Sequence, residues 1–110
     1  MQIQRISRVL AVTAVLPVAA AVAAVGGIVT VSQQNRAFAV SNERIAHGQT
    51  IRFDNDDQFR HQIYVESPSF NFESDEADPG TTVDILFAKA GVFQVRCHIH
   101  PKMLLTVDVN

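Results

Sequence analysis

Side chains that can bind metals or take part in redox chemistry gather in one short segment near the C-terminal end of the chain. Cys97, His100 and Met103 follow one another at intervals of three residues. Cys97 is the only cysteine, and Met103 is the only methionine besides Met1. Because protein cores use methionine as a filler at any position, this co-occurrence favours a built site over chance.

A further histidine lies on a strand-like segment and shares its apolar face. Side chains alternate between the two faces of a strand, so His61 is in phase with Ile63. By the same rule Cys97 is in phase with Val95 and lies opposite His98. A buried imidazole needs a partner to offset its loss of hydration. We therefore expect His61 and Cys97 to share a partner inside one core, and His98 to lie on the surface.

The four candidate ligands are His61, Cys97, His100 and Met103. Two imidazoles and a thiolate in a plane, with a weak axial thioether, describe a blue copper electron-transfer site. Thiolate sulfur suits Cu(I) and imidazole suits both oxidation states, so a fixed intermediate geometry needs little rearrangement when one electron moves. These residues predict one type 1 copper ion.

Other interpretations of the same residues have less support. His61 taken alone is most simply a satisfied core histidine, and Met103 can pack under the loop without binding metal. A Cys–His catalytic pair needs an oriented base and an oxyanion hole, and no glycine-rich or helix-start segment supplies one, so we do not expect an enzyme. Structural zinc usually takes more cysteines than the single one present.

The elements that must position these residues are β-strands. Period-2 alternation dominates after the first 27 residues, and no segment has the period of a helix. Strands are predicted at residues 28–33, 49–54, 60–66, 81–87, 92–97 and 104–109, with a shorter one at 43–46. Short strands with regularly spaced turns predict a small β-sandwich or barrel. His47 is interpreted as a turn residue, and the acidic stretch 73–78 as a solvated loop with partner docking as the alternative.

The opening segment differs in composition from the rest. Arg5 and Arg8 precede a long run of Ala, Val and Leu, and no acidic residue occurs before Glu43. This is typical of a secretory signal, so we predict a Sec-type signal peptide at residues 1–24, followed by one domain at 28–110. The expected location is the periplasm or another extracytoplasmic space. An uncleaved anchor reaching to about residue 31 is the alternative, and only it would bring membrane contact.

Charge and cysteine content exclude some classes of protein. Arg5 and Arg8 lie in the predicted leader, which leaves seven basic residues against all 11 acidic ones and a formal net charge of −4. Nucleic-acid binding, which needs a basic surface, is therefore disfavoured. A single cysteine cannot form an internal disulfide, so in an exported protein it is buried and inert, pairs with another chain, or has its sulfur held by another group. We expect a monomer.

The motifs resemble those of the cupredoxins, the family of type 1 blue copper proteins. Residues 97–103, Cys-His-Ile-His-Pro-Lys-Met, followed by a final apolar strand, resemble the C-terminal end of these proteins. The short Cys-x-x-His-x-x-Met spacing is most like that of amicyanin and related small plastocyanin-like proteins. Residues 48–56 and 90–97 are similar to the family's strands before the first histidine ligand and before the cysteine. The chain departs from the family at Gln62, where many members carry asparagine.

The resemblance implies a Greek-key β-sandwich over residues 28–110. It implies His61 and His100 as nitrogen ligands, Cys97 as the thiolate and Met103 as the axial ligand. The implied function is the transport of single electrons between redox partner proteins, through Cu(I) and Cu(II). His100, beside Ile99 and Pro101, is predicted to be the electron port within an apolar docking patch. The alternative function is an extracytoplasmic accessory protein that delivers or buffers copper.

Overall fold

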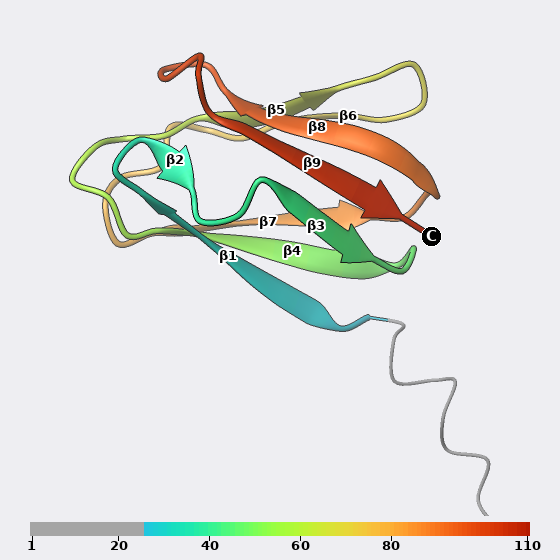
Figure 1. Cartoon of the computed structure of the whole chain (residues 1–110). Helices are drawn as coiled ribbons and strands as arrows, with labels where there is room; N and C mark the ends of the chain where they lie inside the picture. Colours follow the sequence, from blue (N-terminus) through green and yellow to red (C-terminus); the bar gives the residue numbers. More distant parts are fainter. Residues whose placement is uncertain (1–25) are drawn as a thin grey trace, which may run out of the picture.

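The computed structural model describes residues 26–110, so the predicted leader at residues 1–24 lies outside the described part. Its strands are β1 (Ile28–Gln34), β2 (Ala37–Phe38), β3 (Asn42–Ile45), β4 (Gln49–Asn55), β5 (Ile63–Glu66), β6 (Asn71–Glu73), β7 (Thr82–Phe87), β8 (Gly91–Cys97) and β9 (Leu104–Val109). They form two sheets, with strand orders β2-β1-β4-β7 and β3-β9-β8-β5-β6 (Figure 1). Between residues 26 and 110 no helix is long and apolar enough to cross a membrane.

The two sheets face each other and contain both parallel and antiparallel pairs. β1 runs parallel to β4, and β3 runs parallel to β9, while the other neighbours are antiparallel. Parallel neighbours cannot be joined by a tight hairpin, so the chain must pass from one sheet to the other between them. The predicted all-β, Greek-key sandwich is confirmed.

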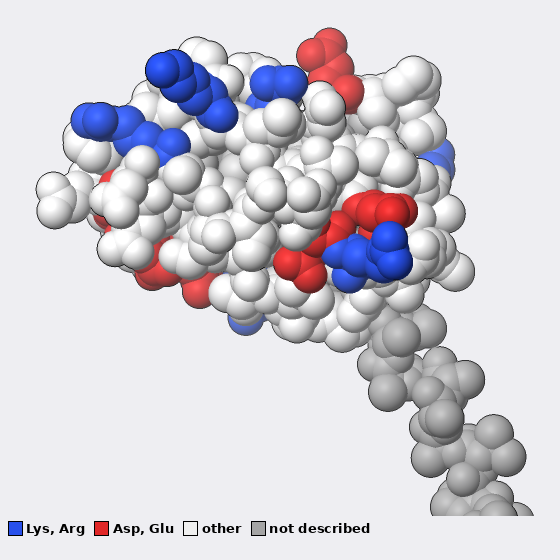
Figure 2. Space-filling model, in the orientation of Figure 1, with Lys and Arg blue, Asp and Glu red and all other residues white. Residues whose placement is uncertain are grey.

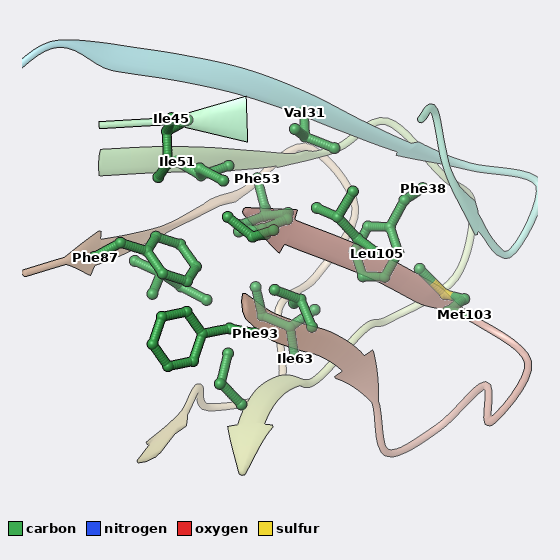
Figure 3. Close-up of a cluster of buried hydrophobic side chains, with 14 of the residues drawn as sticks. Val31, Phe38, Ile45, Ile51, Phe53, Ile63, Phe87, Phe93, Met103 and Leu105 are labelled. Atoms are coloured by element: carbon green, nitrogen blue, oxygen red, sulfur yellow. The ribbon is translucent and has the colours of Figure 1, made fainter. Parts of the chain in front are cut away.

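Alternating side chains from both sheets fill the space between them (Figure 3). On β8, Phe93, Val95 and Cys97 are buried while the residues between them are more exposed, as the sequence pattern predicts. Each fully buried aliphatic or aromatic side chain contributes about 1.5–3 kcal/mol to folding. The same core therefore stabilises the sandwich and fixes the strand that ends at Cys97. Figure 3 also places Met103 beside Phe38, at one edge of this cluster.

One predicted strand is shorter in the structure than expected. Residues 60–66 were expected to be continuous strand, but β5 begins only at Ile63. His61 instead pairs with Ala77 through an isolated bridge, in which each N–H donates to the other carbonyl. The prediction of a strand over residues 60–62 is therefore wrong, because His61 pairs with Ala77 in an isolated bridge and the β5–β8 ladder begins only at Ile63. The other predicted strands are present, with ends that agree or differ by one residue.

Candidate metal centre

Three potential ligands converge at one end of the sandwich. Cys97 is the last residue of β8, His61 lies just before β5, and His100 lies in the loop between β8 and β9. The Cys97 Sγ is 3.7 Å from the His61 Nδ1 and 3.9 Å from the His100 Nδ1. The two imidazole Nδ1 atoms are 3.2 Å apart. Strand pairing accounts for part of this geometry, because Ile63 lies opposite Cys97 in the β5–β8 register.

The triangle formed by these atoms has the size that a metal ion requires. A point equidistant from the three atoms lies about 2.1 Å from each, which matches a usual metal–nitrogen bond of about 2.0–2.1 Å and is slightly shorter than a metal–sulfur bond of about 2.3 Å. These are also the residues whose ligand atoms lie close enough together to hold one ion. The sequence predicts that His61 and Cys97 share a partner inside one core. The geometry agrees with this prediction, and it brings His100 to the same point.

The His61 ring is held in position by a buried carboxylate. Its Nε2 lies 3.0 Å from the Asp57 Oδ2, and the side chain is fully buried. Since a carboxylate can only accept a hydrogen bond, the Nε2 carries the proton and donates it. The Nδ1 is then left with its lone pair facing Cys97 and His100, which is the form that binds a metal.

Asp57 is equipped to remain ionised. Burial alone would raise the pKa of Asp57, but hydrogen bonds from the Arg36 and Gln58 backbone N–H groups, and from His61, outweigh it. The pKa of Asp57 therefore lies below its usual value. A negative charge beside the imidazole Nε2–H raises the electron-donating power of the Nδ1.

The loop that carries Asp57 is fixed by a buried amide. The Asn55 Nδ2 donates to the Phe59 carbonyl at 2.9 Å and to the Ala77 carbonyl at 3.0 Å. Its Oδ1 accepts from the Asp57 N–H at 3.0 Å. Through these three hydrogen bonds, the Asn55 side chain at the end of β4 fixes the conformation of residues 55–59. It also connects them to Ala77, which pairs with His61.

The Cys97 side chain is 2% exposed and accepts a hydrogen bond from the protein backbone. The Gln62 N–H points at the Cys97 Sγ at 3.4 Å, while the His98 N–H donates to the Gln62 carbonyl. A donor to the sulfur stabilises negative charge on it and tunes the reduction potential of a bound metal. Because the donor is a backbone group, the departure from asparagine at position 62 leaves it in place. The Gln62 side chain instead donates to the Ser74 carbonyl.

The loop from His100 to Met103 is closed by a tight turn. The Met103 N–H donates to the His100 carbonyl at 3.0 Å, with Pro101 as the second of the four residues. Proline is favoured there because its fixed φ matches the turn. Met103 is 2% exposed and enters the core at the start of β9, as Figure 3 shows. Its role as axial ligand stays a prediction.

His100 lies between the buried centre and the surface. Burial lowers the pKa of His100, and electrostatic interactions with His61 and Arg36 lower it further, while Asp57 acts in the opposite direction. The ring is therefore kept neutral, the form that binds metal. The edge of the Phe59 ring meets the His100 ring at a centroid distance of 6.0 Å.

His98 lies outside this cluster, as its phase on the strand predicts. Its ring stacks on the Tyr64 ring, with centroids 3.8 Å apart, and its Nε2 lies 3.4 Å from a Glu73 carboxylate oxygen. His47 occupies a turn, as predicted.

Sequence reasoning missed Asp57, Asn55 and Phe59 as parts of the site. Asn55 and Asp57 belong to a polar run that is typical of an ordinary turn. One available signal was that Asp57 precedes His61 by only four residues, which keeps the two side chains close together.

Comparison with known proteins identifies the fold. No protein-family model matches the chain, and no curated protein sequence does. A copper-containing nitrite reductase from Thermus scotoductus SA-01 matches with 29% identity and a TM-score of 0.67, over 74% of this chain and 22% of that chain. The chain thus spans about a fifth of that enzyme. A purple cupredoxin from Nitrosopumilus maritimus matches with 22% identity and a TM-score of 0.66, over 74% of this chain and 98% of the other.

A reduced variant of amicyanin matches with a TM-score of 0.71 and 17% identity, over 76% of this chain and 83% of that chain. The chain therefore has the cupredoxin fold, and its His–Cys–His arrangement fits one type 1 copper ion.

Proposed function

We propose that the chain is an exported electron carrier that binds one type 1 copper ion through His61, Cys97, His100 and Met103. The observation that carries this proposal is the convergence of two imidazole nitrogens and a thiol sulfur on one buried point. The proposal adds Met103 because it is buried and because it closes the turn that begins at His100, three residues earlier. The partners are redox proteins, and the chain itself is not an enzyme.

A bound copper ion supplies the one-electron couple, and the protein keeps the geometry around it constant. His61 cannot swing because Asp57 holds its outer nitrogen and the ring is fully buried. Cys97 is fixed by its strand and by the Gln62 N–H. A site that does not rearrange between oxidation states keeps the energetic cost of electron movement low.

The proposed electron port is His100, with Ile99 and Pro101 beside it. His100 is partly exposed, and the nearby apolar side chains of Ile99 and Phe59 are 40% and 39% exposed. Exposed apolar side chains next to a buried redox centre favour close and dry contact with a partner protein. Electrons then pass between the partner and the centre through one imidazole ring.

We further propose that residues 1–24 are a signal peptide and that the working domain starts near β1. β1 begins at Ile28 and pairs with β4 along its length. A second site with the small residues that signal peptidase requires is Ala37-Phe38-Ala39. Cleavage there would remove this strand, whereas cleavage after residue 24 keeps it. The proposed location is therefore the periplasm or another extracytoplasmic space.

The test of the proposed function is spectroscopic. The copper(II)-loaded protein is expected to have the intense blue colour and narrow copper hyperfine splitting of a type 1 site. Cys97→Ser should abolish the colour, while His98→Gln, which changes a surface imidazole next to it, should retain it. A colourless copper(II) adduct with ordinary tetragonal spectra would contradict the proposal.

The alternative role in copper delivery predicts different kinetics. A delivery protein must release copper readily to its target, whereas a carrier must retain copper through many redox cycles. Measurement of the copper dissociation rate beside the electron self-exchange rate separates the two roles. Slow dissociation with fast self-exchange is expected, because His61 and Cys97 are buried and fixed.

A further inference from the structure

The surface next to His100 carries two basic side chains. A hollow at this end is lined by Asn35, Arg36, Ile99, His100, Pro101 and Lys102. This hollow lies where the β1–β2 turn meets the loop between β8 and β9, at the upper left of Figure 1. Figure 2 shows basic side chains gathered at that end of the same face. We call Arg36 and Lys102, which line this hollow together with the apolar Ile99, the basic rim.

Arg36 adopts a backbone conformation that its residue type disfavours. Asn35 and Arg36 have φ values of 56° and 57°, in the two-residue loop between paired residues Gln34 and Ala37. Hairpin loops of this kind need positive φ at both positions and favour Asn-Gly. An arginine at the second position is strained, and such strain is concentrated at functional sites.

The Arg36 side chain is nevertheless held in a defined place. Its guanidinium carbon lies 4.0 Å from the centroid of the Phe59 ring, in a cation–π contact. Its backbone N–H donates to Asp57, the carboxylate that also orients His61. The charge is thus fixed beside the port rather than moving freely in solvent.

The charges of the basic rim are not neutralised within the described part of the chain. Among residues 26–110, Arg44, Arg52 and Arg60 each lie within 4 Å of a carboxylate, whereas Arg36 and Lys102 do not. The chain beyond the leader has a net charge of −4. Lys89 and Arg96 also have no carboxylate within 4 Å in this part of the chain, but they do not line the hollow. Arg36 and Lys102 are thus two unpaired cations beside the port of an acidic molecule.

We propose that the basic rim selects a redox partner protein whose own electron-transfer site is bordered by carboxylates. This inference rests on the proposed electron-carrier function and adds the charge of the partner to it. The carboxylates of the partner would pair with Arg36 and Lys102 while its apolar centre covers Ile99 and Phe59. Charges at the edge of an interface act mainly on the association rate and its salt dependence.

A protein surface fits this patch better than other anionic partners. A polyanion or an acidic membrane makes many phosphate contacts and requires a broad basic surface. Here only two free cations flank a patch whose centre is apolar, in a molecule of net negative charge. That combination of an apolar centre and a charged edge is the usual anatomy of a protein–protein interface.

The experiment uses small redox probes of opposite charge. The reduced copper-loaded chain gives one electron to hexacyanoferrate(III), which becomes hexacyanoferrate(II), or to tris(phenanthroline)cobalt(III), which becomes the cobalt(II) complex. Rates are measured from an ionic strength of about 0.01 M, where the Debye length is about 30 Å, upward. The rate with the anion is expected to fall as salt is added, although the net charge alone predicts a rise.

Three variants locate the effect. Arg36→Gly and Lys102→Gln should each slow the anionic probe roughly threefold or more at low salt, and the pair roughly tenfold. Both should accelerate the cationic probe. Lys89→Gln is the matched control, because it removes one positive charge at the far end of β8, and it should change either rate less than twofold. Arg36→Gly relieves the strained φ, so its unfolding midpoint should be unchanged or raised.

A second readout does not depend on electron transfer. Addition of the redox-inert hexacyanocobaltate(III) should shift the backbone NMR signals of Asn35, Arg36 and Lys102 and leave that of Lys89 unchanged. Equal rates for Lys102→Gln and Lys89→Gln would overturn the inference, because only the net charge would then matter. Sedimentation with phosphatidylglycerol vesicles that depends on Arg36 and Lys102 would also overturn it, by assigning the rim to a membrane. If the proposed electron-carrier function is wrong instead, the copper-loaded wild-type protein will lack the blue colour. The NMR experiment still shows in that case whether the basic rim binds an anion.

Discussion

At the scale of single residues, the site is defined as much by the groups behind the ligands as by the ligands. His61 could rotate or bind through its other nitrogen if the Asp57 carboxylate did not accept from its Nε2–H. The sequence predicted His61 from its phase on an apolar strand face. It did not predict Asp57, because the sequence does not show whether an acidic side chain in a turn points to solvent or toward the buried histidine.

Asp57→Asn removes the charge behind His61 and keeps the shape of the side chain. We expect copper affinity to fall by about 10- to 100-fold, as for other changes to groups that orient a ligand. The reduction potential should rise, because a less electron-rich imidazole stabilises Cu(II) less. Asp56→Asn, at the exposed neighbouring position, is the control. An unchanged potential in Asp57→Asn would show that the carboxylate only fills space.

Met103→Leu tests the proposed axial ligand. The blue colour should persist, since the thiolate and two imidazoles produce it, while the reduction potential should rise with the loss of the thioether donor. A redox titration followed by absorbance gives both results. The unfolding free energy should change by less than about 1.5 kcal/mol, because leucine has nearly the volume of methionine. Loss of all copper binding would give Met103 a larger role than an axial one.

At the scale of elements, the sequence predicts the long strands well and the short ones poorly. Strands such as β4 and β8 alternate over seven residues, which is enough for the period to be recognised. β2 and β6 have two and three residues and were not predicted, because no alternation can be read over so short a run. They form only because a neighbouring strand offers free hydrogen-bonding groups. The same limit applies to Arg36, which lies in the turn between β1 and β2. Because β2 was not predicted, the position of Arg36 was not predicted either.

A cross-strand ion pair gives the β4–β7 pair a dependence on pH. Arg52 and Asp84 lie opposite each other and form two hydrogen bonds of 2.9 and 3.0 Å. The hydrogen bond from Arg52, together with its charge, lowers the pKa of Asp84, while burial acts in the opposite direction. A carboxyl group with a lowered folded-state pKa stabilises the fold above its unfolded pKa. That contribution is lost as the pH falls through the folded value.

We therefore expect wild-type protein to lose more unfolding free energy than Asp84→Asn between about pH 7 and about pH 2.5. The difference should be small, because both side chains are about half exposed and water screens the pair. Urea unfolding at the two pH values measures it. Arg52→Gln should, like Asp84→Asn, lose less unfolding free energy than wild type over this pH range. If Arg52→Gln loses as much as wild type, the pH dependence comes from another carboxylate.

At the scale of the whole molecule, the core and the metal centre depend on the first strand. β1 lies between β2 and β4 in its sheet and buries Val31, while β2 buries Phe38. A chain lacking residues 1–24 keeps all of these elements, and we expect it to fold and bind copper like the full chain.

Removal of residues 1–39 should instead cost several kcal/mol. Loss of Val31 and Phe38 burial alone removes about 1.5–3 kcal/mol each, from a total that is typically about 5–15 kcal/mol. Circular dichroism and urea unfolding of the two truncated chains give the comparison. Cooperative unfolding at wild-type stability after removal of residues 1–39 would contradict the role given to β1.

Both ends of the described chain lie at the pole of the sandwich opposite the port. The Gly27 carbonyl accepts from Thr50 and the Asn110 carbonyl accepts from His47, while His100 lies at the other end of β8 and β9 (Figure 1). A linker fused to either end would therefore hold the protein with its port facing outward. Immobilised on an electrode through such a linker, the molecule would present His100 to soluble partners, whereas attachment through Lys102 would turn the port toward the support.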